Sequence, residues 1–482
     1  MAFPLETRAY INGKWVEGQG GRFPVMNPAI GEQIAMVTDC TPHDVQTAID
    51  AASVAYKTWK KSTVKERSTI LLKIHKLMLE EKMRDELATI NTMEMGKTKE
   101  GAYGETGFAA SFFEWFAEET RRQYGETIPV PAHGKRFITV KQPVGVVAMI
   151  SPWNFPISML GRKVSAALAA GCTCVLKPAE DTPLTALAFA KICEKAGVPP
   201  GVVNVVPCSR DRVQEVGALL CDSHEVQVLS FTGSTVVGKW LYSRCGNTVK
   251  KLSLELGGDA PFIIFPSADL NKVIKGAMAA KFRNCGQACI SPNRFFVHES
   301  LHDEFVNRFV AAMENEVKLG NGLLPGVTLG PLINQKQHDR CAGLVRSAVS
   351  AGAKMVYQGK DVPGPLFYPP TLLTGVTTDN PIAQDEIFGP VIAIIKFKTE
   401  EDVVKMANDT ERGLAGYFYS EDVSQIWRVA EGMEVGMVSV NEPFFSTCEV
   451  PFGGVKLSGL GKEGSMHGLD EYTHIKLICF GI

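Results

Sequence analysis

The order of apolar and polar positions divides the chain into a helical first part and two series of alternating strands and helices. From Pro143 onward, short apolar runs alternate with helical stretches that begin near Met159 and Leu184; the runs are GVVAMIS, CTCVLKP, VVNVVP and VQVLSFTG. Near-continuous apolar strands joined by helices are typical of a parallel sheet covered on both faces, with ligands beyond the carboxyl ends of its strands. The pattern therefore predicts an α/β unit with a nucleotide site.

A second α/β series begins near Pro261. Its apolar runs are PFIIF, RFFVHES, VIAIIKF, AGYFYS and VGMVSVN, with helices near Leu270 and after Leu301. The region before residue 120 reads as mostly helical, and its amphipathic stretches between Pro42 and Met95 should pack onto the first unit. Strand-like segments at residues 124–142 and at the C-terminal end, YTHIKLICFGI, lie outside both series. Peripheral strands of this kind commonly pair with another subunit.

Charge and composition exclude several classes of protein. The 50 Lys and Arg against 52 Asp and Glu give a net charge of −2 without long runs of one sign, so we expect no nucleic-acid partner. No apolar run approaches the roughly 18 residues of a membrane span. The N-terminus carries Glu6 and Glu17 and has no secretory or presequence pattern, which favours the cytosol. A mitochondrial matrix enzyme whose transit peptide had been removed would look the same.

The 12 cysteines are too dilute for a disulfide scaffold and favour a reducing compartment. Cys172 and Cys174 are one residue apart, but no second Cys or His pair with suitable spacing accompanies them. We therefore interpret them as buried strand cysteines and expect no metal site.

Two stretches are candidates for holding a phosphate-bearing ligand. FTGSTVVG, residues 231–238, follows an apolar strand and opens a helix, so Gly233 and Ser234 would present an N–H and a hydroxyl group at a positive helix N-terminus. In KPAE, Lys177 and Glu180 follow an earlier strand of the same series and would grip a ribose. An ordinary packing turn and solvated surface charges are the alternatives.

Three further residues have the chemistry of a catalytic site. Cys289 lies in a loop-like stretch, FRNCGQAC, where a thiolate would be a nucleophile; a buried filler is the alternative, and Cys285 is a second candidate or a redox partner. Glu255, in LELGG, is a carboxylate in an apolar strand, where burial raises the pKa towards the range of a general base. Asn154, in PWNFP, offers an amide donor at the end of a strand. A rigid loop that only fills space, built from the two prolines and Trp153, is the alternative.

Together these motifs resemble the aldehyde dehydrogenase superfamily. PWNFP, KPAE, FTGSTVVG, LELGG, GQAC, EIFGP and PFGG occur in the superfamily's order and spacing, and the resemblance runs from YINGKW near the N-terminus to SGLGKEG near the end. Within it, AKFRNCGQAC, NVVPCSR and GLDEY are most similar to the succinate-semialdehyde dehydrogenase group. The resemblance implies NAD-dependent oxidation of succinate semialdehyde to succinate. Glutarate semialdehyde or another aldehyde, or a catalytically silent protein on the same scaffold, are the alternatives.

The resemblance also implies a fold. It combines a Rossmann-like parallel-sheet cofactor domain, a second α/β catalytic domain and a small β oligomerisation element. We expect the NAD-binding domain at residues 1–123 and 143–256, and the catalytic domain at residues 257–450. Residues 124–142 and 465–482 would form the oligomerisation element of a homodimer or homotetramer.

Carried over residue by residue, the resemblance makes Cys289 the nucleophile, Glu255 the base and Asn154 an oxyanion donor, with Lys163 as a further catalytic residue. The implied cofactor residues are Ser151, Trp153, Lys177, Glu180, Gly233, Ser234, Glu386 and Phe388. Glu180 would repel the 2′-phosphate of NADP, so NAD is the favoured cofactor and NADP the alternative.

The implied substrate residues are Arg162, Arg283, Thr447 and Phe155. Both arginines match those that clamp the distal carboxylate in the succinate-semialdehyde group, and a guanidinium fork suits a carboxylate. Surface salt bridges are the alternative. Two neighbouring phenylalanines, Phe444 and Phe445, leave the chain length of the substrate open. Ser291 stands where animal relatives carry a second cysteine, so no redox-switch disulfide is expected there.

Overall fold

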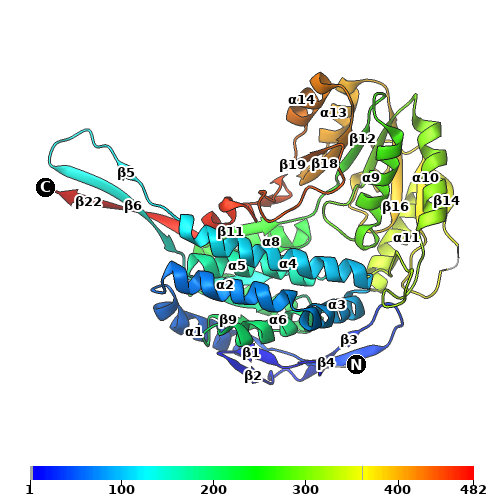
Figure 1. The fold of residues 1–482 in the computed structure, drawn as a ribbon. Coiled ribbons are helices and arrows are strands. Elements are labelled where there is room, and N and C mark those ends of the chain that lie inside the picture. The colour runs from blue at the N-terminus through cyan, green and yellow to red at the C-terminus, as the bar shows by residue number, and fades with distance from the viewer. Residues whose placement is uncertain (1–3, 361) are drawn as a thin grey trace.

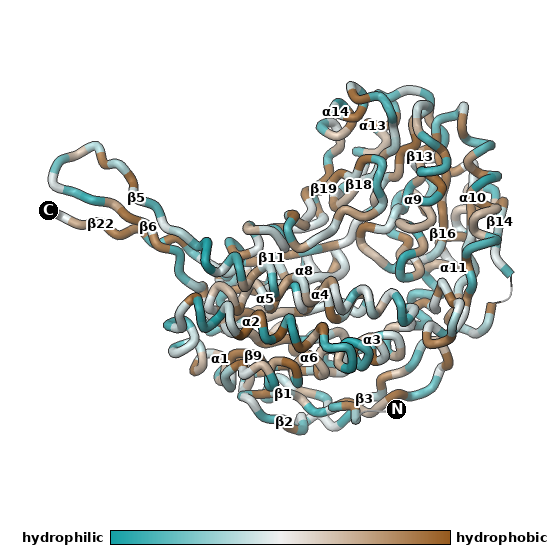
Figure 2. Tube along the Cα trace, in the orientation of Figure 1, coloured by the Kyte–Doolittle hydropathy of each residue, from teal (hydrophilic) through white to brown (hydrophobic). Residues whose placement is uncertain are grey.

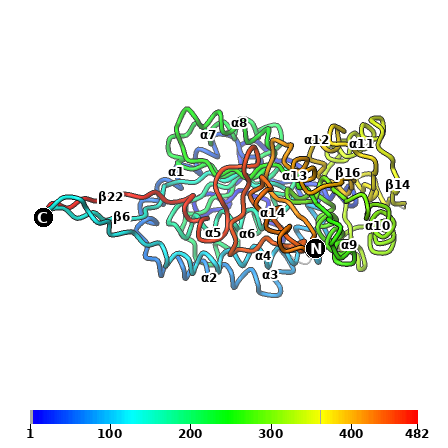
Figure 3. The backbone as a smooth tube through the Cα atoms, turned by 90° about the horizontal axis from the view of Figure 1, so that it is seen from above, coloured from blue at the N-terminus to red at the C-terminus, as the bar shows by residue number. Residues whose placement is uncertain are grey.

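The computed structural model describes residues 4–360 and 362–482. It contains two α/β lobes, each built around one large sheet, and a narrow β arm that extends away from both lobes (Figures 1 and 3). This is the α/β architecture expected from the alternating strands and helices of the sequence.

The sheet of the first lobe has the strand order β2-β1-β9-β8-β7-β10-β11-β21. Its five central strands are parallel: β7 (Val146–Ile150), β8 (Thr173–Lys177), β9 (Val203–Val205), β10 (Val226–Thr232) and β11 (Lys251–Glu255). The first four coincide with the predicted apolar runs, and β11 ends in the predicted strand of LELGG. The connecting helices are α5 (Pro156–Ala170), α6 (Pro183–Ala196), α7 (Val213–Asp222) and α8 (Thr235–Cys245). Strand β21 (Gly459–Leu460) joins antiparallel beside β11 and brings a distant part of the chain next to Glu255.

The prediction of a mostly helical first part is right for four helices: α1 (Pro42–Trp59), α2 (Val64–Leu79), α3 (Glu81–Met95) and α4 (Lys99–Glu119). It is wrong for residues 9–38, which form β1 (Ala9–Ile11), β2 (Lys14–Val16), β3 (Arg22–Met26) and β4 (Gln33–Thr38). Strands this short, one of them containing Pro24, give little period-two signal. The helices cover the first sheet, and Phe112, Phe113 and Phe116 of α4 are fully buried in the core between them.

The sheet of the second lobe has the order β14-β15-β16-β13-β12-β18-β19, parallel except at β14. The strands are β12 (Pro261–Ile264), β13 (Arg294–His298), β14 (Lys354–Gln358), β15 (Thr371–Thr374), β16 (Val391–Phe397), β18 (Ala415–Tyr419) and β19 (Met437–Val440). Its helices are α9 (Leu270–Phe282), α10 (His302–Glu316), α11 (Gln335–Ser350), α12 (Pro381–Gln384), α13 (Glu400–Asn408) and α14 (Val423–Gly432). Strands β17 (Arg412–Gly413) and β20 (Val455–Lys456) pair antiparallel in a separate small sheet.

The arm is an antiparallel sheet that ends near the C-terminus (Figure 1). Strand β6 (Lys135–Pro143) pairs along its whole length with β22 (Thr473–Gly481), and β5 (Thr127–Ile128) pairs with β6. Parts of the arm are hydrophobic in Figure 2, and two of its apolar side chains, Ile475 and Leu477, are 69% and 57% exposed. Residues 466–472 form a 3-10 helix in which Leu469 and Tyr472 are buried. The domain boundaries stay predictions.

No helix among the described residues has the length and apolar character needed to cross a membrane. All 12 cysteines lie in the described part and carry free thiols, and Cys172 and Cys174 are buried in β8 and beside it, as predicted. Within residues 4–360 and 362–482, no three His, Cys, Asp or Glu side chains are grouped as metal ligands.

Candidate active site

The carboxyl ends of β7, β10 and β11 carry the motifs singled out from the sequence. Because β10 pairs in parallel with both other strands, these ends lie at one edge of the sheet. Asn154 lies in the turn after β7, Ser234 begins α8 directly after β10, and Glu255 is the last residue of β11. The structure therefore brings residues separated by about a hundred positions to one edge.

The turn from β10 to α8 has free hydrogen-bonding capacity. Ser234 is the N-cap of α8, and its hydroxyl accepts a hydrogen bond from Val237 N at 3.4 Å. The hydroxyls of Thr232 and Thr235 on either side are buried and have no partner in the described structure. Val236 in the first turn is 79% exposed. A helix N-terminus with unpaired donors suits an anionic ligand such as a pyrophosphate.

Lys177 and Glu180 form a charged cluster at the end of β8. Lys177 Nζ lies 3.4 Å from Glu180 Oε2, and Arg210 Nη2 lies 2.8 Å from Glu180 Oε1. Ser151 N donates to the carbonyl of Lys177 at 3.2 Å, which fixes the first strand end beside the second. The cluster thus contains one residue, Arg210, that the sequence analysis did not single out.

Two glycines after β11 let groups from the second lobe approach closely. Gly258 N donates to Glu386 Oε1 at 3.1 Å. A Cβ on Gly257 would lie 2.7 Å from Glu386 Oε2, and one on Gly258 would lie 2.6 Å from the carbonyl oxygen of Cys289. Burial raises the pKa of Glu386 to about 7. Glycine is therefore required at position 258 for the backbone of Cys289 to reach this turn, and Gly257 leaves room for the Glu386 carboxylate.

An aromatic pair lies in the same region. The rings of Trp153 and Phe388 meet edge to face, with centroids 5.5 Å apart. Phe388 has a φ of +56°, a conformation that is strained for a bulky side chain. The turn that carries Glu386 is thus held in an unusual backbone conformation while its aromatic residue contacts the first lobe.

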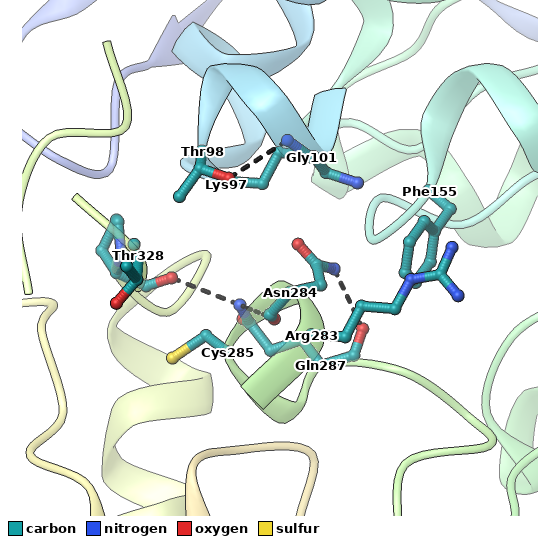
Figure 4. Close-up of a pocket in the computed structure, with 11 residues that line it drawn as sticks. Lys97, Thr98, Gly101, Phe155, Arg283, Asn284, Cys285, Gln287 and Thr328 are labelled. Carbon is teal, nitrogen blue, oxygen red and sulfur yellow. Dashed lines mark hydrogen bonds between the residues drawn. The ribbon is translucent and has the colours of Figure 1, made fainter. Parts of the chain in front are cut away.

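Cys289 is the accessible thiol of its loop. It is partly exposed, whereas Cys285 is buried, and in Figure 4 the Cys285 sulfur points away from Arg283. Desolvation, with the nearby Glu386 and Glu255 carboxylates, raises the pKa of Cys289 to about 12, against the opposing charge of Arg162. The thiol must therefore lose its proton before it can act as a nucleophile.

Glu255 is the second titratable group of the site. Its carboxylate is buried, and neither oxygen has a hydrogen-bond partner in the described structure. Desolvation, together with the negative charge of Glu463, raises the pKa of Glu255 well above its usual value, although Lys163 and Arg162 oppose this. An unpaired carboxyl group with a raised pKa has the properties of a general base.

Lys163 lies near Glu255, but its ammonium group is bound by other side chains. Its Nζ is paired with Glu463 Oε1 and donates to Ser230 Oγ at 2.9 Å, and the side chain is fully buried. The sequence analysis did not single out Glu463. Its position between Gly461 and Gly464 in SGLGKEG, the motif at the end of the resemblance, was the available signal.

Asn154 is fixed next to the loop of Cys289. Its Nδ2 donates to the carbonyl of Gln287 at 3.0 Å. Its own backbone carbonyl accepts from Lys97 Nζ at 2.8 Å and from Asn284 Nδ2 at 2.9 Å. The amide donor and the thiol loop are therefore joined directly.

The two predicted arginines lie among aromatic rings. Arg162 is buried, with its guanidinium 4.1 Å from the centre of the Phe452 ring and its Nη1 3.5 Å from Glu463 Oε2, yet Nε and Nη1 have no hydrogen-bond partner in the described structure. Arg283 is exposed and lies 5.5 Å from Phe155 and 5.6 Å from Phe444. Both guanidinium groups retain donors for an anion.

The hydroxyl beside Arg162 belongs to Ser446 rather than Thr447. Arg162 Nη2 donates to Ser446 Oγ at 3.4 Å, whereas Thr447 is exposed. Ser446 is therefore the hydroxyl that contacts Arg162, and the substrate role of Thr447 stays a prediction.

Comparison with known proteins identifies the family. The model of the "Aldehyde dehydrogenase family" matches residues 15–478. The chain is 51% identical over 478 residues to the mitochondrial succinate-semialdehyde dehydrogenase of Rattus norvegicus, covering 99% of this chain and 91% of that protein. It is 46% identical over 476 residues to the glutarate-semialdehyde dehydrogenase of Pseudomonas putida, covering 98% of each.

A solved structure agrees with this assignment. The structure described as an E. coli NADP dependent enzyme superposes with a TM-score of 0.97 at 46% identity, covering 99% of this chain and 98% of that one. The matching arrangement extends over both lobes and the arm. The chain therefore belongs to the aldehyde dehydrogenase family and is an aldehyde-oxidising enzyme.

Proposed function

We propose that the enzyme oxidises succinate semialdehyde to succinate with NAD. The observation that carries this proposal is a pair of guanidinium groups: in the described structure, Arg162 keeps unpaired donors close enough to act on the charge of Cys289, and Arg283 contacts only aromatic rings. A charge-assisted contact to a carboxylate contributes about 1.5 to 3 kcal/mol, which favours an aldehyde with a distal carboxylate over a plain alkanal. The similarity to the rat succinate-semialdehyde dehydrogenase supports the same substrate.

The chemistry begins at Cys289. Once the thiol proton has passed to a water molecule, the sulfur attacks the carbonyl carbon of the aldehyde, and the carbonyl oxygen becomes an alkoxide. Asn154 Nδ2 and the backbone N–H of Cys289 would donate hydrogen bonds to this oxygen. Loss of a hydride from the same carbon leaves a thioester on Cys289. Glu255 then takes a proton from water, and the hydroxide releases the acid and the free thiol.

Lys163 acts next to this base. Its ammonium group is paired with Glu463, whose charge is one cause of the raised pKa of Glu255. Lys163 also lowers that pKa by its own positive charge. We infer that Lys163 and Glu463 together set how readily Glu255 holds and gives up a proton.

The residues at the edge of the first sheet fit a dinucleotide. Lys177 and Glu180 would hold the adenosine ribose, the turn at Gly233 and Ser234 would bind the pyrophosphate, and Glu386 with Phe388 would hold the nicotinamide riboside. The neighbouring Ser151 and Trp153 would complete this surface. The unpaired hydroxyls of Thr232 and Thr235 support a ligand at this turn. The nicotinamide, when bound, is the hydride acceptor.

Glu180 favours NAD, because its carboxylate would repel a 2′-phosphate on the ribose it holds. Arg210, at 2.8 Å, offsets part of this negative charge, and the E. coli relative is described as NADP dependent. We therefore propose that NAD is preferred and that NADP is used less efficiently.

A second candidate substrate is glutarate semialdehyde. The P. putida relative acts on it by name, and the exposed Phe444 lies beside Arg283, which leaves the chain length of the substrate open. We further propose that the apolar arm mediates self-association into a dimer or tetramer. The compartment stays a prediction, with the cytosol first and the mitochondrial matrix second.

A panel of aldehydes with the purified enzyme tests the function. We expect kcat/KM with NAD to be at least about tenfold higher for succinate semialdehyde than for propanal. Comparable values for the two would reject the carboxylate clamp. A higher value for glutarate semialdehyde would favour the second candidate, and the same panel with NADP measures the cofactor preference.

A further inference from the structure

A buried ion pair lies behind the nucleophile loop. Lys97, in the loop between α3 and α4, pairs with Glu105 of α4, and their side chains are only 4% and 1% exposed. Glu105 Oε2 also accepts from Asn91 Nδ2 at 2.8 Å. Burying two charges is costly unless their other polar atoms also form hydrogen bonds. The further hydrogen bonds of Lys97 and Glu105 therefore indicate which segments the ion pair holds in place.

Glu105 caps α5, which begins 51 positions later in the chain. Its Oε1 accepts hydrogen bonds from Ile157 N and Ser158 N, both at 3.1 Å, in the first turn of α5. The N-cap residue of α5, Phe155, supplies no side-chain cap of its own. A carboxylate at a helix N-terminus satisfies unpaired N–H groups and interacts favourably with the helix dipole. Glu105 thereby fixes the segment that directly follows Asn154.

Lys97 reaches the proposed oxyanion donor itself. Its Nζ donates to the backbone carbonyl of Asn154 at 2.8 Å. Asn284 Nδ2 donates to the same carbonyl at 2.9 Å and to the carbonyl of Gln287 at 3.1 Å, and Gln287 O in turn accepts from Asn154 Nδ2. Asn154 is thus tied on one side to the ion pair and on the other to the loop of Cys289.

The nucleophile loop needs such support because its backbone is strained. Asn284 and Cys285 have φ values of +51° and +58°, followed by Gly286 at +71°. Residues other than glycine keep a positive φ only where contacts with their surroundings hold the backbone in that conformation. Figure 4 shows Asn284 standing between the Gln287 turn and the helix that follows Lys97, with its amide nitrogen bonded to Gln287.

We propose that Lys97, Glu105 and Asn284 are positioning residues that hold the Asn154 amide at a fixed separation from the backbone N–H of Cys289. This inference rests on the proposed oxyanion role of Asn154. The two donors come from different lobes, and the network is a direct polar connection between them. Without it the oxyanion donors would no longer converge on one point, although the thiol, the base and both arginines would remain.

Glu94 provides a matched control. It is also a buried carboxylate that caps a distant helix, since Leu184 N and Thr185 N of α6 donate to it at 2.8 and 2.9 Å. None of these bonds reaches the turn of Asn154. Loss of Glu94 should therefore reduce stability without changing the oxyanion geometry.

The experiment compares Lys97→Met, Lys97→Arg, Glu105→Gln and Glu94→Gln in the full-length enzyme. The active fraction is counted by alkylation of Cys289, and kcat and KM are measured with succinate semialdehyde and propanal, together with NAD affinity and Tm. We expect Lys97→Met and Glu105→Gln to lower kcat per active site by about 10- to 100-fold, since loss of one oxyanion donor costs roughly 100- to 1,000-fold. NAD affinity should stay within about twofold, because the network does not contact the cofactor edge, and kcat should fall with both aldehydes, because both form the same oxyanion.

Lys97→Arg should recover part of the lost kcat, and Glu94→Gln should lower Tm while kcat per active site is unchanged. If Lys97→Met does not fold, Asn284→Gly is the second variant. It removes the hydrogen bonds from Asn284 to Asn154 and Gln287, glycine tolerates the positive φ of this position, and no buried charge loses its partner. The same loss of kcat is expected. The inference is overturned if these variants keep wild-type kcat per active site, or if Glu94→Gln loses as much. Equal wild-type rates with both aldehydes would instead refute the proposed substrate and leave the inference standing.

Discussion

The substitution Arg283→Met tests the proposed carboxylate clamp with little disturbance elsewhere. Arg283 is exposed, makes no ion pair or hydrogen bond in the described structure and lies between two aromatic rings, Phe155 and Phe444. A methionine keeps much of the length and the ring contacts but removes the charge. Arg162 is a less direct target because it also lies 3.5 Å from Glu463, a neighbour of the proposed base.

The size of the effect follows from the bond that is lost. A charge-assisted hydrogen bond contributes about 1.5 to 3 kcal/mol, and each 1.4 kcal/mol is tenfold, so specificity should fall by about 10- to 150-fold. We expect kcat/KM for succinate semialdehyde to fall by this factor, while kcat/KM for propanal stays within about twofold. Arg283→Lys keeps the charge without the guanidinium fork and should fall between methionine and wild type.

Steady-state assays of NADH formation measure these values. Parallel loss with both aldehydes would mean that Arg283 supports the nucleophile loop rather than the substrate. An unchanged ratio with unchanged rates would place the distal carboxylate elsewhere and refute the clamp.

Three more predictions concern the base, the cofactor and the arm. Because the pKa of Glu255 is raised, the rate of acyl-enzyme hydrolysis should increase with pH through that pKa. Glu255→Gln should abolish this increase and leave an NADH burst in stopped-flow traces. Wild-type steady-state turnover by this variant would exclude Glu255 as the base. Glu180→Gln should shift kcat/KM towards NADP by roughly tenfold, and an unchanged NAD to NADP ratio would argue against repulsion. Ile475→Asp should give a smaller particle in light scattering than wild type or Lys476→Ser, and equal masses would reject assembly through the arm.

Much of the fold was predictable because it is local. The strands that end at Ile150, Lys177 and Thr232 are continuous apolar runs, and each is followed by a helix. The strands at residues 9–38 were missed because they are short and get their stability from pairing, as Tyr10 does with Val205 in β9. The structure, not the sequence pattern, fixes which edge of the sheet each of them joins.

The site was predictable where residues belong to a recognisable motif. Cys289, Glu255 and Asn154 are of this kind. The structure leaves Cys289 partly exposed, both oxygens of Glu255 unpaired and Asn154 bonded to Gln287, and their catalytic roles stay proposals. Glu463 and the pair of Lys97 with Glu105 escaped prediction because their roles depend on contacts across the fold. Lys163 and Glu463, for example, are 300 positions apart in the chain. No periodicity or spacing connects such residues.

The central claim is that the Cys289 sulfur carries the acyl group during turnover. Peptide mass spectrometry on Glu255→Gln, quenched in acid after mixing with succinate semialdehyde and NAD, measures this directly. Fragmentation is needed because Cys285 and Cys289 lie on one tryptic peptide, between Arg283 and Arg294. The account predicts a succinyl group on Cys289 that is absent without NAD; acylation of Cys285, or no acyl-enzyme despite NADH formation, would contradict it.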